Sequence, residues 1–352
     1  MIDVLVVDDS ALIRQLLSAI LSSADDINVI ATASDPYVAR DKIKQLNPDV
    51  LTLDIEMPRM DGVTFLGNLM RLRPMPVVMV STLTDQGADI TLRALELGAV
   101  DFIAKPKLDV AQMLPHYAEE IVAKVRAAAN ASVKPLERSP PISKKDVENR
   151  VLKSNKKMSH FRTTDRIIGI GSSTGGTEAI KDVLRNLSPD MPGIVISQHI
   201  PAAFSAPFAE RVNGITDLSV MQAVDGQQIL SGHVYIAPGD AHLLVRRDGA
   251  RYVCALSDAP EVNRHRPSVD VMFRSLAQNA GSNAIAVMLT GMGADGAKGM
   301  GEMKEAGAQT LAQDENSSVV WGMPGEAYKR GFVDELQPLL AIGERLRQLS
   351  VE

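Results

Sequence analysis

The amino-acid sequence predicts an α/β protein with two parallel-sheet domains joined by a linker. Short apolar runs alternate with amphipathic segments of helical period in both halves of the chain, an order that is typical of a parallel sheet covered by helices. Between the halves, hydrophobic periodicity is lost over a segment rich in proline, serine and lysine. The chain has 352 residues, enough for two domains of ordinary size. We therefore expect domains at residues 1–125 and 164–352, with a linker at residues 126–163.

Composition and charge narrow the class of protein. The hydrophobic fraction is 45% and the charged fraction is 23%, values that are ordinary for a globular protein. The formal net charge of −6 argues against a nucleic-acid binder. Cys254 is the single cysteine, so the chain cannot form an internal disulfide, which fits a reducing compartment.

Nothing in the sequence predicts insertion into a membrane. No apolar stretch approaches the roughly 20 residues that are needed to span a bilayer. The first apolar run is interrupted by Asp3, Asp8 and Asp9, which is atypical of a secretory signal peptide. We therefore expect a cytoplasmic protein without direct membrane insertion.

The N-terminal half alternates five apolar runs with five helical patterns. The apolar runs, which predict strands, cover residues 4–7, 29–33, 50–53, 77–80 and 102–104. The helical patterns cover residues 11–21, 37–45, 63–72 and 88–97, and a last one begins near residue 110. This alternation predicts a doubly wound, five-stranded parallel sheet. The active crevice of such a sheet lies at the carboxyl ends of its strands.

Polar residues follow four of these predicted strands. Asp8 and Asp9 end the first strand and Asp54 ends the third. Ser81 ends the fourth strand and Lys105 ends the fifth. Aspartate and serine at strand ends are often only helix N-caps. Three carboxylates at one sheet edge, however, would repel one another unless a cation such as Mg²⁺ neutralised them. Lys105 and the Ser81 hydroxyl would then suit a bound phosphoryl group.

These residues, together with the proline after Lys105, resemble the signature of response-regulator receiver domains, which have a flavodoxin-like fold. The resemblance implies that Asp54 accepts a phosphoryl group and that Asp8, Asp9 and Asp54 hold Mg²⁺. It also implies that Lys105 and Ser81 contact the phosphoryl oxygens. Phosphorylation adds charge and strong hydrogen-bond acceptors, so it can shift a surface that has two states.

The C-terminal half again alternates strand and helix patterns. Predicted strands cover residues 167–170, 193–197, 284–289 and 309–312, and predicted helices cover residues 178–187, 204–212, 268–280, 297–306 and 338–349. A β-rich stretch intervenes, with predicted strands at residues 218–223, 233–237, 243–247 and 251–256. An Asp-Gly pair separates the last two strands, which is a hairpin signal. We expect a parallel sheet with a β-hairpin insertion.

The first strand of this half leads into a glycine-rich turn. The turn fits the pattern G-x-S-x-G, with Ser173 at its centre. A serine on a tight strand-to-helix turn is lifted clear of the backbone, as a nucleophile requires. A glycine turn before a helix also suits the pyrophosphate of a dinucleotide. The turn by itself is therefore compatible with a hydrolase and with a nicotinamide-dependent oxidoreductase.

The residues that follow two other predicted strands, at residues 193–197 and 284–289, favour the hydrolase. A dinucleotide site wants an acidic residue after the second strand, but the chain has Gln198 and His199 there. A histidine beside a serine turn can activate a nucleophile, and Asp295 follows a third strand, where it could orient the imidazole. Each residue alone is also typical of a turn, cap or structural role, but together they predict a Ser173–His199–Asp295 triad. The competing residues are His116, His160, His233, His242, His265 and Asp314.

Five separate motifs in this half resemble the catalytic domain of chemotaxis protein-glutamate methylesterases. They occupy residues 171–180, 198–199, 235–240, 263–270 and 289–296. The resemblance implies that the substrate is a glutamate γ-methyl ester on the cytoplasmic helices of methyl-accepting chemoreceptors. It also implies deamidation of receptor glutamines by the same triad, and a chemotaxis histidine kinase as the phosphodonor.

The resemblance also assigns roles at the site. Ser173 attacks the ester, His199 transfers the proton and Asp295 orients the imidazole. The backbone N–H of Thr174 and a donor at Met292 would stabilise the oxyanion. No cofactor is implied for the ester chemistry, because Mg²⁺ belongs only to the N-terminal domain.

A regulatory role for the N-terminal domain follows from the same resemblance. Without phosphate, this domain is expected to block the active-site cleft, and phosphorylation is expected to weaken that contact. Phe102 matches the aromatic position that rearranges with Ser81 on activation. Two arginines beside the proposed triad, Arg264 and Arg266, either guide acidic receptor helices or pair internally.

A DNA-binding output domain is the alternative that is not an enzyme. Such a domain would show a helix-turn-helix pattern or a basic helix after the linker, and neither pattern is present. The sequence therefore favours an enzymatic output and no nucleic-acid partner.

Overall fold

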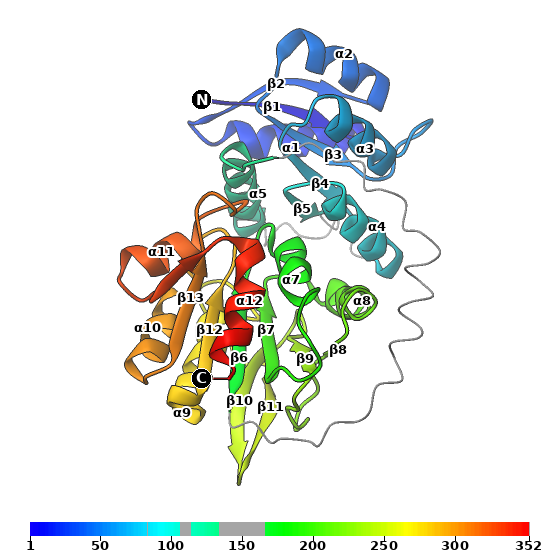
Figure 1. Cartoon of the computed structure of the whole chain (residues 1–352). Helices are drawn as coiled ribbons and strands as arrows, with labels where there is room; N and C mark the ends of the chain where they lie inside the picture. The colour runs from blue at the N-terminus through cyan, green and yellow to red at the C-terminus, as the bar shows by residue number, and fades with distance from the viewer. Residues whose placement is uncertain (83, 106–113, 134–165, 352) are drawn as a thin grey trace.

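The computed structural model describes residues 1–82, 84–105, 114–133 and 166–351. This part of the chain forms two α/β domains, each built on its own parallel sheet (Figure 1). The fold class predicted from the sequence is confirmed. Most of the linker predicted at residues 126–163 falls outside the described residues, although the last helix of the N-terminal domain continues to Ala129.

The N-terminal sheet has five parallel strands in the order β2-β1-β3-β4-β5. The strands are β1 (Ile2–Val7), β2 (Ile27–Ala33), β3 (Val50–Asp54), β4 (Val77–Ser81) and β5 (Asp101–Ala104). The helices are α1 (Ala11–Ser22), α2 (Pro36–Leu46), α3 (Gly62–Leu72), α4 (Asp85–Glu96) and α5 (Leu114–Ala129). The start predicted for the last helix, near residue 110, lies outside the described residues.

Local sequence features explain where these elements begin. Four residues accept a hydrogen bond from a backbone N–H in the first turn of the following helix, namely Ser10, Asp35, Asp61 and Thr84. Strands β3 and β4 are buried along their whole length, as expected in a sheet covered on both faces. A Cβ on Gly62 would lie 1.9 Å from the carbonyl oxygen of Asp54. Glycine therefore allows α3 to approach the end of β3 closely.

The C-terminal sheet has seven parallel strands in the order β14-β13-β12-β6-β7-β9-β8. The strands are β6 (Ile167–Ser172), β7 (Gly193–Gln198), β8 (Ser219–Gln222), β9 (His233–Ile236), β12 (Ala284–Met288), β13 (Gln309–Gln313) and β14 (Glu335–Gln337). The α-helices are α7 (Gly176–Leu184), α8 (Ala202–Asn213), α9 (Val269–Asn279), α10 (Ala297–Glu305), α11 (Met323–Lys329) and α12 (Leu339–Leu349). A 3-10 turn, η1 (Gly281–Asn283), precedes β12.

The β-rich stretch is divided between two sheets. Strands β8 and β9 join the parallel sheet, whereas β10 (His242–Asp248) and β11 (Arg251–Ser257) form a separate antiparallel hairpin. The sequence did not predict β14 or α11. These elements have three and seven residues, which is too short for hydrophobic periodicity to show.

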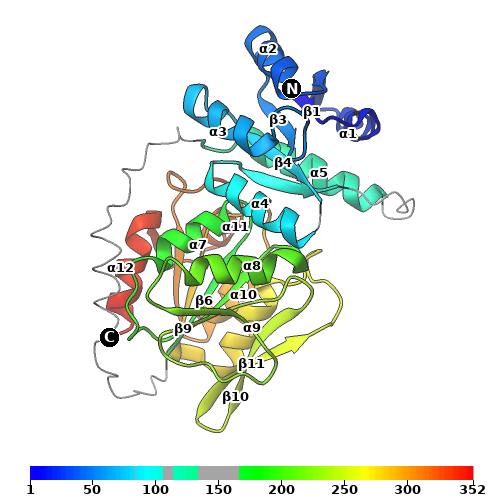
Figure 2. The same ribbon diagram turned by 90° about the vertical axis from the view of Figure 1, so that its right-hand side faces the viewer.

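The N-terminal domain covers one end of the C-terminal sheet. Helix α4 packs against α7 and α8 (Figure 2). Phe102 of β5 stacks on Phe204 of α8, with ring centroids 4.6 Å apart. Lys181 of α7 donates to Glu96 of α4 at 2.6 Å. These contacts place the N-terminal domain over the carboxyl ends of β6 and β7, where the sequence predicts the catalytic residues.

Candidate active site

Ser173 and His199 directly follow the paired ends of two central strands. Ser172, the last residue of β6, pairs with Gln198, the last residue of β7. The His199 N–H donates to the Ser172 carbonyl oxygen at 3.1 Å. On the other side of β6, the Ser173 N–H donates to the carbonyl oxygen of Thr290, just beyond β12, at 3.1 Å. The structure therefore brings the three predicted strand ends together at one edge of the sheet.

Asp295 is held toward His199 by a set of hydrogen-bond donors. Its Oδ2 atom lies 2.8 Å from Nε2 of His199. The carboxylate also accepts from Asn263 Nδ2, Ser268 Oγ and Val269 N at 2.7–2.8 Å. Burial by itself raises the pKa of Asp295. The hydrogen bond with His199 and those from the other donors outweigh burial and hold this pKa well below its ordinary value. The carboxylate is therefore ionised and can fix the orientation of the imidazole.

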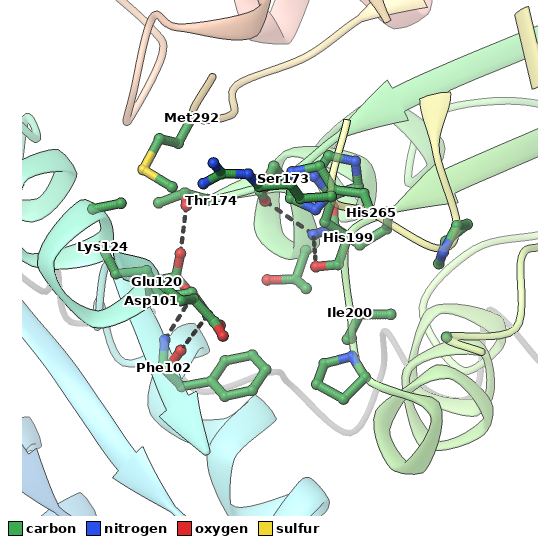
Figure 3. A pocket seen from close by; sticks show the side chains of 18 of the residues that line it. Asp101, Phe102, Glu120, Lys124, Ser173, Thr174, His199, Ile200, His265 and Met292 are labelled. Atoms are coloured by element: carbon green, nitrogen blue, oxygen red, sulfur yellow. Dashed lines mark hydrogen bonds and ion pairs between the residues drawn. The ribbon is translucent and has the colours of Figure 1, made fainter. Parts of the chain in front are cut away.

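The second ring nitrogen of His199, Nδ1, is buried and has no hydrogen-bond partner among the described residues. The Ser173–His199 hydrogen bond is thus not formed in this structure, although both side chains line the same cleft (Figure 3). Because Nε2 is bound to Asp295, Nδ1 is the nitrogen that remains for a serine proton. Catalytic hydrogen bonds are often long before substrate binds and shorten in the complex.

The backbone beside Ser173 presents hydrogen-bond donors. Within the described part of the chain, neither the Thr174 N–H nor the Met292 N–H donates to a backbone acceptor, and both residues line the cleft. Gly175 follows in the left-handed region at φ +77°, and a Cβ there would lie 2.7 Å from the Cβ of Val319. Glycine is therefore required for this turn, which carries the N–H groups that an oxyanion site needs.

The cleft in front of Ser173 has a volume of about 410 Å³ and is lined by both domains. Figure 3 shows Asp101, Phe102 and Lys124 of the N-terminal domain on the side of the cleft opposite Ser173. The hydroxyl of Thr174 donates to the carboxylate of Asp101. The N-terminal domain therefore restricts access to the serine.

A second cluster of charged residues lies at the carboxyl edge of the N-terminal sheet. Oxygen atoms of Asp8, Asp9 and Asp54 lie within 4.8 Å of one another. Lys105 Nζ lies 2.8 Å from Asp54 Oδ1 and 3.6 Å from Asp8 Oδ2. Burial raises the pKa of Asp54 to about 6 against the lowering effect of Lys105. The acidic residues and the lysine predicted for this edge are therefore brought together.

Comparison with known families decides between the remaining interpretations. Residues 168–346 match the CheB methylesterase family, and residues 4–115 match the response regulator receiver domain family. The chain belongs to the CheB methylesterase family.

Curated relatives of this CheB methylesterase match it over nearly its full length. It is 57% identical over 350 residues to protein-glutamate methylesterase/protein-glutamine glutaminase 2 of Xanthomonas oryzae pv. oryzae, covering 99% of this chain and 97% of the relative. It is 55% identical over 370 residues to the protein-glutamate methylesterase/protein-glutamine glutaminase of Hydrogenovibrio crunogenus, covering 99% and 98%. The crystal structure of the Thermotoga maritima CheB methylesterase catalytic domain is 38% identical, with a TM-score of 0.52, and covers 52% of this chain and 98% of that chain.

The enzyme is a response-regulator methylesterase and glutaminase of chemotaxis, activated through its receiver domain. The family match confirms the resemblance on which the sequence prediction rests, and it sets aside the oxidoreductase and the DNA-binding output. Among the helices that the structure describes, none has the length and apolar character that crossing a membrane would require.

The acidic cluster of this CheB methylesterase fits a divalent cation. The Oδ2 atoms of Asp8 and Asp54 are buried and have no hydrogen-bond partner among the described residues. Lys105 Nζ lies 3.6 Å from Oδ2 of Asp8, beyond hydrogen-bond distance. Buried carboxylate oxygens without donors are costly unless a proton or an ion compensates them. Three clustered carboxylates are also the oxygen ligands that Mg²⁺ prefers. The receiver assignment and the chemistry of the cluster therefore agree.

We predict that ionised Asp54 destabilises the metal-free receiver domain. The folded pKa of about 6 exceeds the value of about 3.9 in an unfolded chain. The folded state therefore binds the proton more tightly, and the contribution of this group to the free energy of unfolding increases as pH falls from about 7 to about 4. In EDTA at pH 7.5, Asp54→Asn should increase the free energy of unfolding by roughly 1–3 kcal/mol.

Urea unfolding at two pH values checks this prediction. The advantage of Asp54→Asn over the wild type should shrink at pH 5, where Asp54 of the folded wild type is protonated. Asp41→Asn is a matched control, because Asp41 is in an exposed pair with Arg40 at 3.0 Å. An Asp54→Asn advantage that is equal at both pH values would contradict the proposed cause.

The two residues expected to rearrange on activation have different surroundings. Ser81 is buried in the receiver, and its Oγ lies 2.6 Å from Oγ1 of Thr91. Phe102 instead packs between the domains, against Phe204 and with Lys124 Nζ 5.0 Å from its ring centroid. Phe102 is therefore positioned to transmit a change in the receiver to the catalytic domain.

Most of the competing residues that the structure describes have structural roles. His242 lies 3.1 Å from the carbonyl of Pro260, and Asp314 accepts from the Ser317 N–H in a turn. His265 is different, because its ring stacks on that of His199 with centroids 3.7 Å apart. His233 lies on β9, and its Nδ1 is 2.9 Å from a backbone carbonyl. The side chains of His116 and His160 fall outside the described residues.

Two supporting residues were not identified from the sequence. Asn263 donates to both Asp295 and Asp270 at 2.7 Å. Asn263 lies in the sequence motif at residues 263–270, which could have marked it as a site residue. A motif by itself does not indicate which residue the side chain bonds. Asp101, which accepts from Thr174, had no local signal because its partner lies 73 residues away.

Proposed function

We propose that Ser173, His199 and Asp295 form the catalytic triad of this methylesterase. The observation that carries the proposal is the 2.8 Å contact between His199 and Asp295 beside the Ser173 turn. Asp295 is ionised and accepts further hydrogen bonds from Asn263, Ser268 and Val269, so the imidazole keeps one orientation. Methanol release from methylated chemoreceptor membranes is the assay, with Ser173→Ala and Asp295→Asn as the decisive variants.

Ester hydrolysis on these residues proceeds in two halves. Ser173 Oγ attacks the γ-carbonyl carbon while Nδ1 of His199 takes the serine proton, and Asp295 stabilises the imidazolium. The imidazolium then gives this proton to the departing methoxide, so methanol leaves and an acyl-enzyme remains. Water attacks the acyl-enzyme with His199 as the base, which releases the glutamate and restores Ser173. A glutamine side chain would follow the same path with ammonia as the leaving group.

The tetrahedral oxygen requires donors of its own. The backbone N–H groups of Thr174 and Met292 take this role, since both residues line the cleft and neither N–H has a backbone acceptor in the described part of the chain. Donors fixed before the reaction stabilise the developing negative charge without reorganisation.

Strand β5 links phosphorylation to the active site. At its end, Lys105 contacts Asp54, the proposed phosphoryl acceptor, at 2.8 Å. Along the same strand, Phe102 packs on the catalytic domain and Asp101 accepts from Thr174. A phosphoryl group on Asp54 would bind Lys105 and Ser81, shift β5 and weaken the contact that covers the cleft.

The proposed partners follow from the two domains. A chemotaxis histidine kinase is the phosphodonor, and Asp8, Asp9 and Asp54 would hold Mg²⁺, which neutralises charge on the transferred phosphoryl group. Methyl-accepting chemoreceptors supply the glutamyl esters on their cytoplasmic helices, which places the enzyme in the cytoplasm. No nucleic acid takes part.

We keep the domain boundaries proposed from the sequence, with the receiver at residues 1–125 and the catalytic domain at residues 164–352. The two family matches, at residues 4–115 and 168–346, support this division. Helix α5 runs to Ala129, so the first residues of the proposed linker continue the last helix of the receiver.

We predict that Asp54→Asn removes activation by a phosphodonor. The variant should hydrolyse receptor methyl esters at the rate of the unphosphorylated wild type, because Asp54 does not line the cleft. It should lose the whole increase that acetyl phosphate and Mg²⁺ produce in the wild type, since the acceptor carboxylate is gone. Methanol release with and without the phosphodonor measures both rates.

Asp41→Asn serves as the control, because Asp41 is an exposed receiver carboxylate outside the acidic cluster. It should respond to the phosphodonor as the wild type does. Stimulation of Asp54→Asn equal to that of the wild type would exclude Asp54 as the regulatory acceptor.

A further inference from the structure

The ion pairs between the two domains share one arrangement of charge. Among the described residues, every ion pair that joins the domains takes its carboxylate from the receiver and its cation from the catalytic domain. The pairs are Lys181 with Glu96 at 2.6 Å, Arg211 with Glu96 at 3.1 Å and with Asp89 at 3.4 Å, and Arg264 with Glu119 at 2.6 Å. The carboxylates lie on helices α4 and α5. A cationic surface of the catalytic domain therefore meets an acidic helical surface.

Arg264 lies in the segment that supports the proposed triad. The preceding residue, Asn263, donates to Asp295 at 2.7 Å, and the following residue, His265, stacks on His199. Arg264 itself has φ +66°, which is unusual for a residue with a side chain. Such conformations persist where the surrounding structure holds them, and they cluster at functional sites. Arg264 also lines the catalytic cleft.

The two arginines of this segment bind different partners. Arg266 Nη1 donates to the carbonyl oxygens of Asp258 and Ala259 at 2.8 and 3.3 Å, so Arg266 pairs within its own loop. Arg264 instead binds Glu119 of the receiver, and its side chain is 69% exposed. Because Glu119 belongs to the other domain, the guanidinium loses this partner when the receiver leaves the cleft. Arg264 is then a cation presented at the entrance to the active site.

The substrate class presents the same charge as Glu119. Each turnover converts a neutral methyl ester into a glutamate carboxylate, so a helix with several such esters acquires carboxylates beside those that remain. Glu119 is likewise a glutamate on a helix, and it lines the cleft next to Glu120. A guanidinium binds carboxylates well, because its planar N–H groups match their geometry.

We propose that Arg264 binds a second, unesterified glutamate on the substrate helix. Glu119 on α5 occupies the same position in the closed chain and acts as a mimic of that glutamate. The inference rests on the proposed cleft and triad. Helix α5 then competes with the substrate for Arg264. The same guanidinium contributes to closure before phosphorylation and to substrate binding afterwards.

The test uses the full-length enzyme with acetyl phosphate and Mg²⁺, so that closure does not limit the rate. KM and kcat are measured on two receptor membranes, one with its native glutamates and one in which the glutamates flanking a single methyl-ester site are alanine. Alanine is used because the enzyme would convert glutamine to glutamate. Wild type should show a KM about two- to five-fold lower for the native receptor at similar kcat, as expected for an exposed ion pair. Arg264→Ala should lose this preference, and Arg264→Lys should keep part of it.

Glu119→Gln separates closure from substrate recognition. In the unphosphorylated chain it should raise kcat/KM by about two- to five-fold, because Arg264 is released. After phosphorylation it should keep the wild-type preference between the two receptors. Arg126→Ala is the matched control, because Arg126 also lies on α5 in an exposed pair, with Asp26 at 2.6 Å, and does not line the cleft. It should match the wild type in both measurements.

An Arg264→Ala variant that retains the wild-type preference overturns the inference. If Arg264→Ala also raises kcat/KM of the unphosphorylated chain, as Glu119→Gln does, the Arg264–Glu119 pair serves closure alone. A failure of the triad proposal would look different, because Ser173→Ala would then release methanol from both receptors.

Discussion

Ser173→Ala should reduce methanol release from methylated receptor membranes by about 10⁵- to 10⁶-fold. The substitution removes the oxygen that forms the acyl-enzyme, and the neighbouring Thr174 hydroxyl donates to Asp101. Any remaining rate would come from the oxyanion donors and from substrate binding. The measurement is made on the full chain with a phosphodonor, so that loss of chemistry is not confused with closure of the cleft.

Ser172→Ala is the matched control for this prediction. Ser172 directly precedes Ser173 as the last residue of β6, but its side chain is buried and donates to Oε1 of Gln198 at 2.6 Å. Removing this hydroxyl should cost stability of about 1–3 kcal/mol and leave the chemistry in place. The reverse result, with an active Ser173→Ala and an inactive Ser172→Ala, would move the nucleophile to the neighbouring residue.

Asp295→Asn should reduce kcat by about 10³- to 10⁴-fold. Asn263 and Ser268 donate to Oδ1 of Asp295 and the Val269 N–H donates to Oδ2. The amide oxygen of the variant should take the Oδ1 position, so the Val269 N–H loses its acceptor. The amide NH₂ would then face Nε2 of His199 and place the ring proton on Nδ1. A protonated Nδ1 cannot accept the proton of Ser173, so the catalytic base is lost while the shape of the site is kept.

The neighbouring carboxylate Asp270 provides the control for Asp295→Asn. Asp270 is also buried, and burial raises its pKa, but it accepts from Asn263 and from the Gly299 N–H and does not contact His199. Asp270→Asn should reduce kcat less than about ten-fold. Circular dichroism of both variants separates misfolding from loss of the base. Equal losses of kcat in two folded variants would argue against a specific role for Asp295.

The strand ends were predictable because local patterns mark them. Apolar runs followed by Ser173, His199 or Asp54 identify where buried strands stop, and parallel strands in one sheet end at the same edge. This is why both charged clusters could be expected before any distances were known. The hairpin of β10 and β11 was equally visible from its turn sequence.

Other features of the structure could not be predicted from the local sequence. The stretch that forms β8 and β9 was expected in the insertion, but both strands join the parallel sheet. Pairing of a strand with one sheet rather than another depends on which buried faces it contacts, and its own periodicity does not encode that choice. Asp101 and Glu119 were missed for a similar reason, because their partners Thr174 and Arg264 lie in the other domain.

The sequence by itself determined the two α/β domains, the residues at their strand ends and the family to which they belong. Only the tertiary structure decided that His199 bonds Asp295 through Nε2, that burial raises the pKa of Asp54 to about 6 and that acidic helices of the receiver meet cations of the catalytic domain. The physical reason is that strand ends follow from local periodicity and turn chemistry. Burial, charge pairing and closure instead depend on residues far apart in the chain.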